Sequence, residues 1–326
     1  MSRRILAGIS AAIATVRRKL ASGSLAALVA RIPPAWRRPG RLIFAAAVLL
    51  VIVLIVVTRP APAPAPRHPA GTRVFRVSGN RLVLRFVHSN GSVHVTAGPA
   101  GQVSIKEDRN GLIQAINTRY RQSGDAVTVT VSVENGLPTA TWVDFDVAVP
   151  RNTNATVDVA AGTLRAAGVT GNVVLQDTNG SIWASNVTGA MALRTTSGSI
   201  NTSQVNGQVS AITENGTITA ISTRLGGHSL VQAQSGTISF HGSLDSECHA
   251  VFRNTNGAIA ITLPRSSSVV VDARTPDGSI NSEFSAVHVA SQAKDRVASG
   301  RIGRDAPARL SIQTKSGSID LNHGVP

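Results

Sequence analysis

The stretch NGSIWASNVTGAMALRTTSGSI, residues 179–200, contains one full copy of the repeat that decides the fold. It begins and ends with a tetrapeptide of Asn or Ser, Gly, Ser and Ile, and the two tetrapeptide glycines, Gly180 and Gly198, are 18 residues apart. Gly189, which ends a looser Val-Thr-Gly group, lies midway between them. A fixed period of about 20 residues is typical of proteins in which similar structural units stack on one another.

The tetrapeptide recurs along the C-terminal half of the chain, in units of 18–22 residues. Runs such as MALRT at residues 191–195 precede it, and their alternation of apolar and polar side chains predicts a strand with one buried face. Asn, Ser or Asp before Gly favours the positive φ of a tight turn. We therefore expect the Ile that ends each copy to face inward. The eight copies are residues 179–182, 197–200, 215–218, 235–238, 256–259, 277–280, 299–302 (a degenerate SGRI) and 316–319.

One such unit cannot bury its apolar face alone, whereas stacked units form a continuous aliphatic core. The sequence therefore predicts an all-β protein in which residues 151–326 form a β-solenoid, a parallel β-helix-like stack of 18–22-residue repeats. The aromatic content of only 3% fits a narrow interior. Residues 72–150 lack this period but are rich in alternating runs, and we predict that they form an N-terminal β cap that shields the edge of the first repeat.

An apolar segment near the N-terminus predicts one transmembrane helix. Residues 42–58 are 17 uncharged residues between two arginines, which is enough to cross a bilayer. Residues 1–41 carry nine basic side chains and no acidic one, so the positive-inside tendency predicts a cytoplasmic N-terminus and an extracytoplasmic C-terminal domain. A cleaved signal peptide is the alternative, but the run begins only at residue 42 and prolines follow every candidate cleavage site. Residues 59–71 alternate Pro and Ala and predict a semi-rigid linker.

The basic tail, residues 1–41, has a pattern of its own. Apolar residues between positions 5 and 20 recur at helical spacing beside Arg17, Arg18 and Lys19, which is typical of an amphipathic helix on an anionic membrane surface. A disordered tail that only sets the topology is the alternative.

The net charge of +15 belongs to the N-terminal part of the chain, because residues 122–326 carry 13 basic and 15 acidic side chains. Phosphate backbones are bound by a clustered positive face on a folded domain. We therefore expect no nucleic-acid partner. The single cysteine, Cys248, excludes a disulfide framework and a Cys-based zinc or iron–sulfur site.

The order of these motifs resembles a known family. WVDFDVAVPRNTNATVDVAAGTLRAAGVTGNVVLQDTNGSI at residues 142–182, the serial tetrapeptides, ARTPDGSI at 273–280 and SGRIG at 299–303 are similar to the bacterial putative-adhesin-like family of β-strand-repeat domains of unknown function. The resemblance covers roughly residues 75–322. It implies a β-solenoid-like domain at the cell envelope, often behind a single transmembrane helix, and it supplies no catalytic residues. Some relatives are associated with envelope-stress responses.

One group of residues has the spacing of a metal site. Asp245, Glu247 and His249 would share a face if they lay on one strand, and together they could hold a divalent metal ion. Cys248 would then point the other way, toward the core. An outward polar face of a lengthened repeat is the alternative reading. Asp144 and Asp146 form a similar pair, for which a solvated strand face is again the alternative.

A ligand surface is the other candidate site. The exposed side chains that could contribute are an aromatic and three turn asparagines: Trp183, Asn179, Asn215 and Asn256. Polysaccharide-cleaving β-helix enzymes instead need acidic side chains on neighbouring repeats. The column three positions before each turn glycine contains one carboxylate, Asp177, so we expect no catalytic residues.

The sequence thus predicts a non-catalytic, membrane-anchored cell-envelope protein without a cofactor. Its exported β-repeat domain would act as an adhesin-like binding or scaffold surface for cell-wall glycan or another envelope protein. The first alternative is an envelope-stress sensor or regulator that couples the exported domain to the cytoplasmic tail. The second is a carbohydrate-active β-helix enzyme.

Overall fold

The computed structural model describes residues 71–78, 82–110, 116–133, 142–292, 295–305 and 307–324. All of them belong to one compact unit, Ala65–Pro326. The predicted tail and transmembrane helix lie outside the described residues, as does the predicted linker except for Gly71. Among the residues that are described, no helix has the length and apolar character to cross a membrane.

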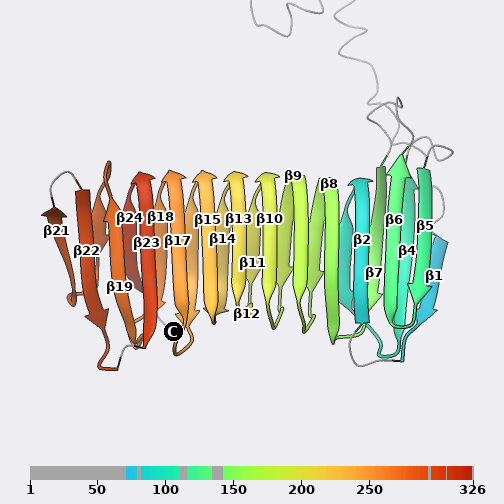
Figure 1. The fold of residues 1–326 in the computed structure, drawn as a ribbon, viewed down its shortest axis with the longest axis horizontal. Coiled ribbons are helices and arrows are strands. Elements are labelled where there is room, and N and C mark those ends of the chain that lie inside the picture. Colours follow the sequence, from blue (N-terminus) through green and yellow to red (C-terminus); the bar gives the residue numbers. More distant parts are fainter. Residues whose placement is uncertain are drawn as a thin grey trace, which may run out of the picture. The chain divides into compact units, whose positions relative to one another are not determined.

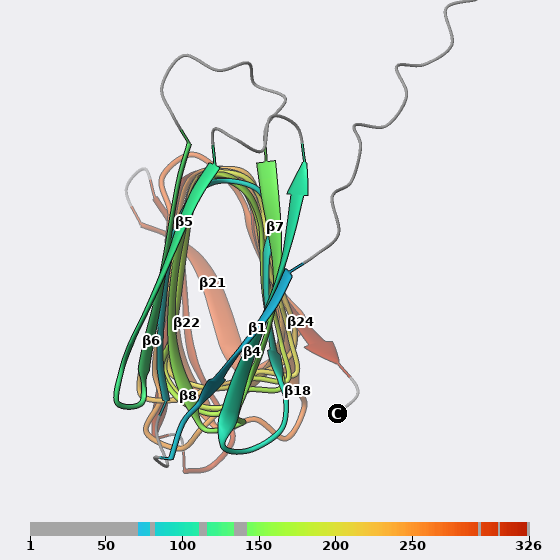
Figure 2. The ribbon, with the colours of Figure 1, turned by 90° about the vertical axis from the view of Figure 1, so that its right-hand side faces the viewer.

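The repeats form a stack of rungs with two walls of parallel strands. Figure 1 shows the rungs side by side, and Figure 2, which looks along the stack, shows the two walls as the long sides of a narrow loop. The first wall runs, in spatial order, β6 (Ala126–Val133), β2 (Leu82–Asn90), β8 (Thr153–Ala167), β9 (Val173–Ser185), β10 (Met191–Ser197), β13 (Val209–Asn215), β15 (His228–Ser235), β17 (His249–Asn256), β23 (Ala308–Ser316) and β19 (Val269–Thr275).

The second wall contains the strands that follow each glycine turn. Its spatial order is β7 (Trp142–Val149), β3 (Val93–Ala97), the C-terminal parts of β8 and β9, β11 (Ile200–Ser203), β14 (Ile218–Leu225), β16 (Ile238–Leu244), β18 (Ile259–Pro264), β24 (Ile319–Gly324) and β20 (Ile280–Ser282). The two-residue strand β12 (Asn206–Gly207) pairs with the end of β14. The prediction of an all-β, solenoid-like stack is confirmed.

Equivalent positions of successive repeats lie side by side because the parallel register follows the period. Leu193, for example, is opposite Leu175 on one side and Ala211 on the other. The Ile that ends each tetrapeptide is buried in all eight copies, which confirms the inward orientation. The core therefore consists of layers of aliphatic side chains between the walls.

The turn glycines are required by close approach of the backbone. A Cβ atom on Gly180 would overlap with the carbonyl oxygen of Gly162 in the preceding rung, and one on Gly198 would overlap with that of Gly180. Gly198 also has a φ of 151°, which side-chain-bearing residues rarely adopt. The tetrapeptide keeps its glycine because the next turn occupies the space that a side chain would need.

A buried polar column accompanies this glycine column. Three residues before the turn glycine, the side chain donates a hydrogen bond to the glycine carbonyl of an adjacent rung, as Thr195 does to Gly180 (3.1 Å) and Asn254 does to Gly236 (2.8 Å). Thr213, Thr275 and Thr314 make the equivalent bond. These bonds satisfy carbonyl groups that the stacked turns remove from water. Two members of the column, Asp177 and Ala233, carry no hydroxyl or amide donor.

The N-terminal end of the stack is closed by antiparallel strands. β1 (Gly71–Arg76) and β4 (Gln102–Asn110) extend the second wall beyond β7, and β5 (Ile116–Ser123) extends the first wall beyond β6. Residues 72–150 also supply more than a cap: β2 and β3, joined by the turn at Asn90–Gly91, stack in parallel on β8 and form a rung. The parallel stack therefore begins before residue 151.

A buried carboxylate links the two walls at this closed end. Glu107 on β4 accepts hydrogen bonds from Arg109 (2.7 Å) and from two side chains of β5, Thr118 (2.6 Å) and Tyr120 (2.6 Å). Burial by itself would raise the pKa of Glu107, but the hydrogen bonds from Arg109, Thr118 and Tyr120 outweigh it and hold this pKa below its usual value. Glu107 is thus an ionised anchor between β4 and β5.

The C-terminal end departs from the order of the sequence. After β18 the chain skips one position in the stack before it forms β19 and β20. The repeat formed by β23 and β24 then occupies the skipped position, between β17 and β19 in the first wall and between β18 and β20 in the second. β22 (Asp295–Ile302) pairs antiparallel with β19 and with β21 (Val287–Gln292), and these strands end the first wall. The prediction that residues 299–302 are a repeat copy is therefore wrong, because they continue an antiparallel strand.

Candidate ligand-binding surface

The three predicted asparagines lie on one edge of the stack. Asn179 is exposed at the turn within β9, and Asn215 and Asn256 are exposed at the ends of β13 and β17; serines occupy the equivalent position of the rungs between them. Neighbouring parallel strands are about 4.8 Å apart, so successive asparagines are separated by roughly 10 Å. The edge is a regular row of amides and hydroxyls.

Trp183 lies on the outer face of the second wall and is 42% exposed. It directly follows the tetrapeptide that begins with Asn179. The guanidinium carbon of Arg165 lies 5.3 Å from the centre of the indole, and Asn201 is its neighbour on the other side. A cation held over an indole face stabilises the orientation of the ring. Trp183 therefore presents a fixed aromatic surface beside polar neighbours.

The structure does not bring Asp245, Glu247 and His249 onto one strand face. Asp245 and Glu247 lie in the turn between β16 and β17, where Glu247 has a φ of 64°, and only His249 is on a strand. The carboxylate of Asp245 pairs with Arg224 instead. In the part of the chain that the structure describes, no group of three or more His, Cys, Asp or Glu side chains could hold a metal ion. The predicted convergence was wrong because the strand ends at Leu244.

Cys248, which directly precedes β17, belongs to the core and is fully buried. Burial, with a smaller contribution from Asp245, raises the pKa of its thiol to about 11. The thiol is therefore protonated near neutral pH and poorly reactive.

The carboxylates of Asp144 and Asp146 have separate partners. Asp144 accepts a hydrogen bond from the backbone N–H of Ser92 (2.8 Å), whereas Asp146 is exposed and pairs with His94 (3.3 Å) and Lys106 (3.8 Å). These contacts give each carboxylate a structural role at the join between β3 and β7.

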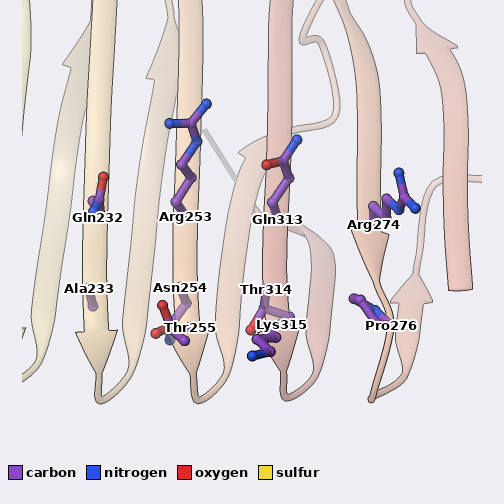
Figure 3. A pocket seen from close by; sticks show the side chains of 10 residues that line it. All are labelled: Gln232, Ala233, Arg253, Asn254, Thr255, Arg274, Pro276, Gln313, Thr314 and Lys315. Atoms are coloured by element: carbon purple, nitrogen blue, oxygen red, sulfur yellow. The ribbon is translucent and has the colours of Figure 1, made fainter. Parts of the chain in front are cut away.

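A pocket that the sequence did not indicate opens on the outer face of the first wall. It has a volume of about 410 Å³ and lies across β15, β17, β23 and β19 (Figure 3). Arg253, Gln313 and Arg274 are neighbours in register on three of these strands, and Lys315 lies two residues beyond Gln313. These residues are far apart in the sequence, and only the insertion of β23 between β17 and β19 brings them together. No pattern in a single repeat could have revealed them.

Comparison with known proteins places this fold in a family. The model of the Toastrack family DUF4097 matches residues 83–322. No curated protein matches the chain.

Several solved structures are similar to this chain at low sequence identity. A putative adhesin from Parabacteroides distasonis is 10% identical, with a TM-score of 0.42 over 77% of this chain and 96% of that one. A putative adhesin from Bacteroides fragilis is 12% identical, with a TM-score of 0.36 over 77% and 96% of the two chains. A putative lipid binding protein from Parabacteroides distasonis is 9% identical, with a TM-score of 0.36 over 78% and 97%. The family match covers most of the chain, and the stack of parallel rungs agrees with it; the chain therefore belongs to the Toastrack family, DUF4097.

Proposed function

We propose that this protein is a non-catalytic, membrane-anchored component of the cell envelope whose exported β-repeat domain is an adhesin-like binding surface. The observation that carries the proposal is the exposed row of turn residues to which Asn179, Asn215 and Asn256 belong. Stacked glycines and the buried hydrogen bonds of the inner column hold this row at a constant spacing. Because the row is already ordered, the protein itself loses little conformational entropy when an extended ligand binds to it.

The polar side chains favour binding over hydrolysis. The inner column is made of threonine, asparagine and alanine apart from Asp177, so this column supplies no pair of carboxylates on neighbouring rungs for acid–base work. Amides, hydroxyls and one exposed indole are groups that bind sugars through hydrogen bonds and stacking. We therefore propose cell-wall glycan as the partner.

The test is a pull-down of bacterial cell-wall material by the full chain in detergent micelles. We expect wild-type protein to sediment with the wall fraction and Trp183→Ala to sediment less, because the exposed indole is lost. Trp142→Ala, which removes a half-buried indole from the first part of β7, is the matched control. Absence of wild-type protein from the wall fraction would contradict the proposal. Release of reducing sugar from that fraction by the wild-type protein would contradict its non-catalytic part.

A further inference from the structure

The pocket on the first wall concentrates positive charge, although residues 122–326 are almost neutral as a whole. Arg253, Arg274 and Lys315 come from β17, β19 and β23, and Figure 3 shows the two arginines on the strands that flank β23. No Asp or Glu is among the described residues that line the pocket. Its electrostatic potential is therefore set by cations.

Two of these cations have no counter-ion. Arg274 donates a hydrogen bond to Asp295 (2.6 Å), a carboxylate outside the pocket lining. Arg253 and Lys315 make no ion pair with any residue that the structure describes, and both side chains are exposed. Because both line the same pocket, an anion bound there would be attracted by both.

The remaining side chains define the class of anion. Gln232 and Gln313 supply amide donors and acceptors on either side of Arg253, and Thr255 supplies a hydroxyl. A guanidinium binds a carboxylate or phosphate through two parallel hydrogen bonds, whereas amides and hydroxyls bind sugar hydroxyl groups. A pocket of about 410 Å³ is within the range of sites for small ligands. A long nucleic-acid backbone would need many more cations along its path.

We infer that this pocket binds an acidic sugar unit of a glycan, with the positive potential of Arg253 and Lys315 attracting its anionic group and the two glutamines holding its hydroxyl groups. The inference rests on the proposed adhesin-like function and names the part of the glycan that the protein recognises. The anion is a carboxylate of a uronic acid or a phosphodiester that links sugar or polyol units, and both carry the same oxyanion chemistry.

The test measures the binding of fluorescently labelled oligosaccharides to the full chain in detergent micelles by fluorescence anisotropy. The probes are an oligogalacturonate, its neutral methyl ester and a phosphodiester-linked glycerol phosphate oligomer. We expect one of the anionic probes to bind at least about tenfold more tightly than the methyl ester, because the ester has no charge for the arginine and lysine to attract; tenfold corresponds to about 1.4 kcal/mol. Whichever anionic probe binds more tightly identifies the source of the anion.

Variants at exposed positions assign the binding to this pocket without disturbing the core. The double variant Arg253→Gln with Lys315→Gln should lose about tenfold or more in affinity, and the affinity of the wild-type protein should fall as salt is added. Arg194→Gln is the control: it removes one positive charge from the outer row that contains Arg253, three rungs away in the first wall, and should keep wild-type affinity. Circular dichroism checks that every variant keeps its strands.

Two outcomes would overturn the inference. One is equal binding of the anionic probes and the methyl ester, and the other is unchanged affinity in the double variant. If the wild-type protein still sediments with cell-wall material in either case, the adhesin-like function stands and only the assignment of this pocket fails. If it does not sediment either, the proposed function fails as well.

Discussion

Replacing Asp177 with threonine should stabilise the protein at neutral pH. Asp177 is 5% exposed and occupies the inner column, where most other members donate a hydrogen bond to a glycine carbonyl. Its Oδ1 atom accepts from the backbone N–H of Asn179 (3.0 Å), but its Oδ2 atom has no partner and lies next to the carbonyl oxygen of Gly162. An ionised carboxylate cannot donate to that oxygen, whereas a threonine hydroxyl can.

The magnitude follows from the proton equilibrium. Burial, aided by the nearby charge of Asp158, raises the pKa of Asp177 from 3.8 to about 6. Because the folded pKa is the higher one, the folded state binds the proton more tightly, and this group lowers stability progressively as the pH rises from about 4 to about 6. Two pKa units correspond to about 3 kcal/mol. Allowing for the lost bond to Asn179, Asp177→Thr should gain about 2 kcal/mol at pH 7.5 and much less at pH 4.

Guanidinium unfolding of the full chain in detergent micelles, followed by tryptophan fluorescence at several pH values, measures this difference. Asp272→Asn is the control, because it removes a similar charge from an exposed position on β19 of the same wall and should change stability by less than about 0.5 kcal/mol. The reasoning is refuted if Asp177→Thr is destabilising at pH 7.5, or if its effect is the same at pH 4.

Three further perturbations test other parts of the stack. Gly198→Ala should destabilise the domain by about 3 kcal/mol in thermal unfolding, because its Cβ meets the carbonyl of Gly180, while Gly71→Ala, with open space around it, should be neutral. Glu107→Gln should cost about 1–3 kcal/mol at pH 7. The pKa of Glu107 in the folded protein is below its ordinary value of 4.5, so its ionised form stabilises the fold above about pH 4.5, and this contribution is lost as the pH falls through the folded pKa. The difference in unfolding free energy between Glu107→Gln and wild type should therefore narrow in denaturation at pH 3. Deleting residues 307–326 should accelerate hydrogen exchange in β17 and β19, which lose their shared neighbour; unchanged protection there would contradict the described strand order.

Most of the fold can be predicted from the period of the sequence, because each repeat has the same turn and the same alternation of apolar and polar residues. The turn glycine, the alternation before it and the isoleucine after it specify one rung and its inner face, and these predictions were confirmed. The rung of β2 and β3 was missed because its turn, Asn90–Gly91, is separated from the periodic region by the antiparallel strands of the cap. The local pattern of residues does not show that strands of the cap are inserted between one rung and the next.

The order of the rungs and the pocket could not be predicted. Parallel pairing between any two repeats buries the same kinds of side chain. The repeat pattern of the sequence therefore does not predict that β23 pairs with β17 rather than with β22. The charged pocket depends on that pairing, since it places Lys315 between Arg253 and Arg274. The metal hypothesis failed for a local reason: the turn at Asp245–Glu247 contains a positive φ that alternation of residue types does not reveal.

The inserted final repeat also has a consequence for biosynthesis. β17 and β19 are made before β23, the segment that joins them, so each has one unpaired edge until residues 308–316 have been synthesised. If synthesis stops before residue 308, or if a protease removes β23, the position between β17 and β19 stays open and their edges can pair with other molecules. Synthesis of β23 is therefore the step that closes this position in the first wall.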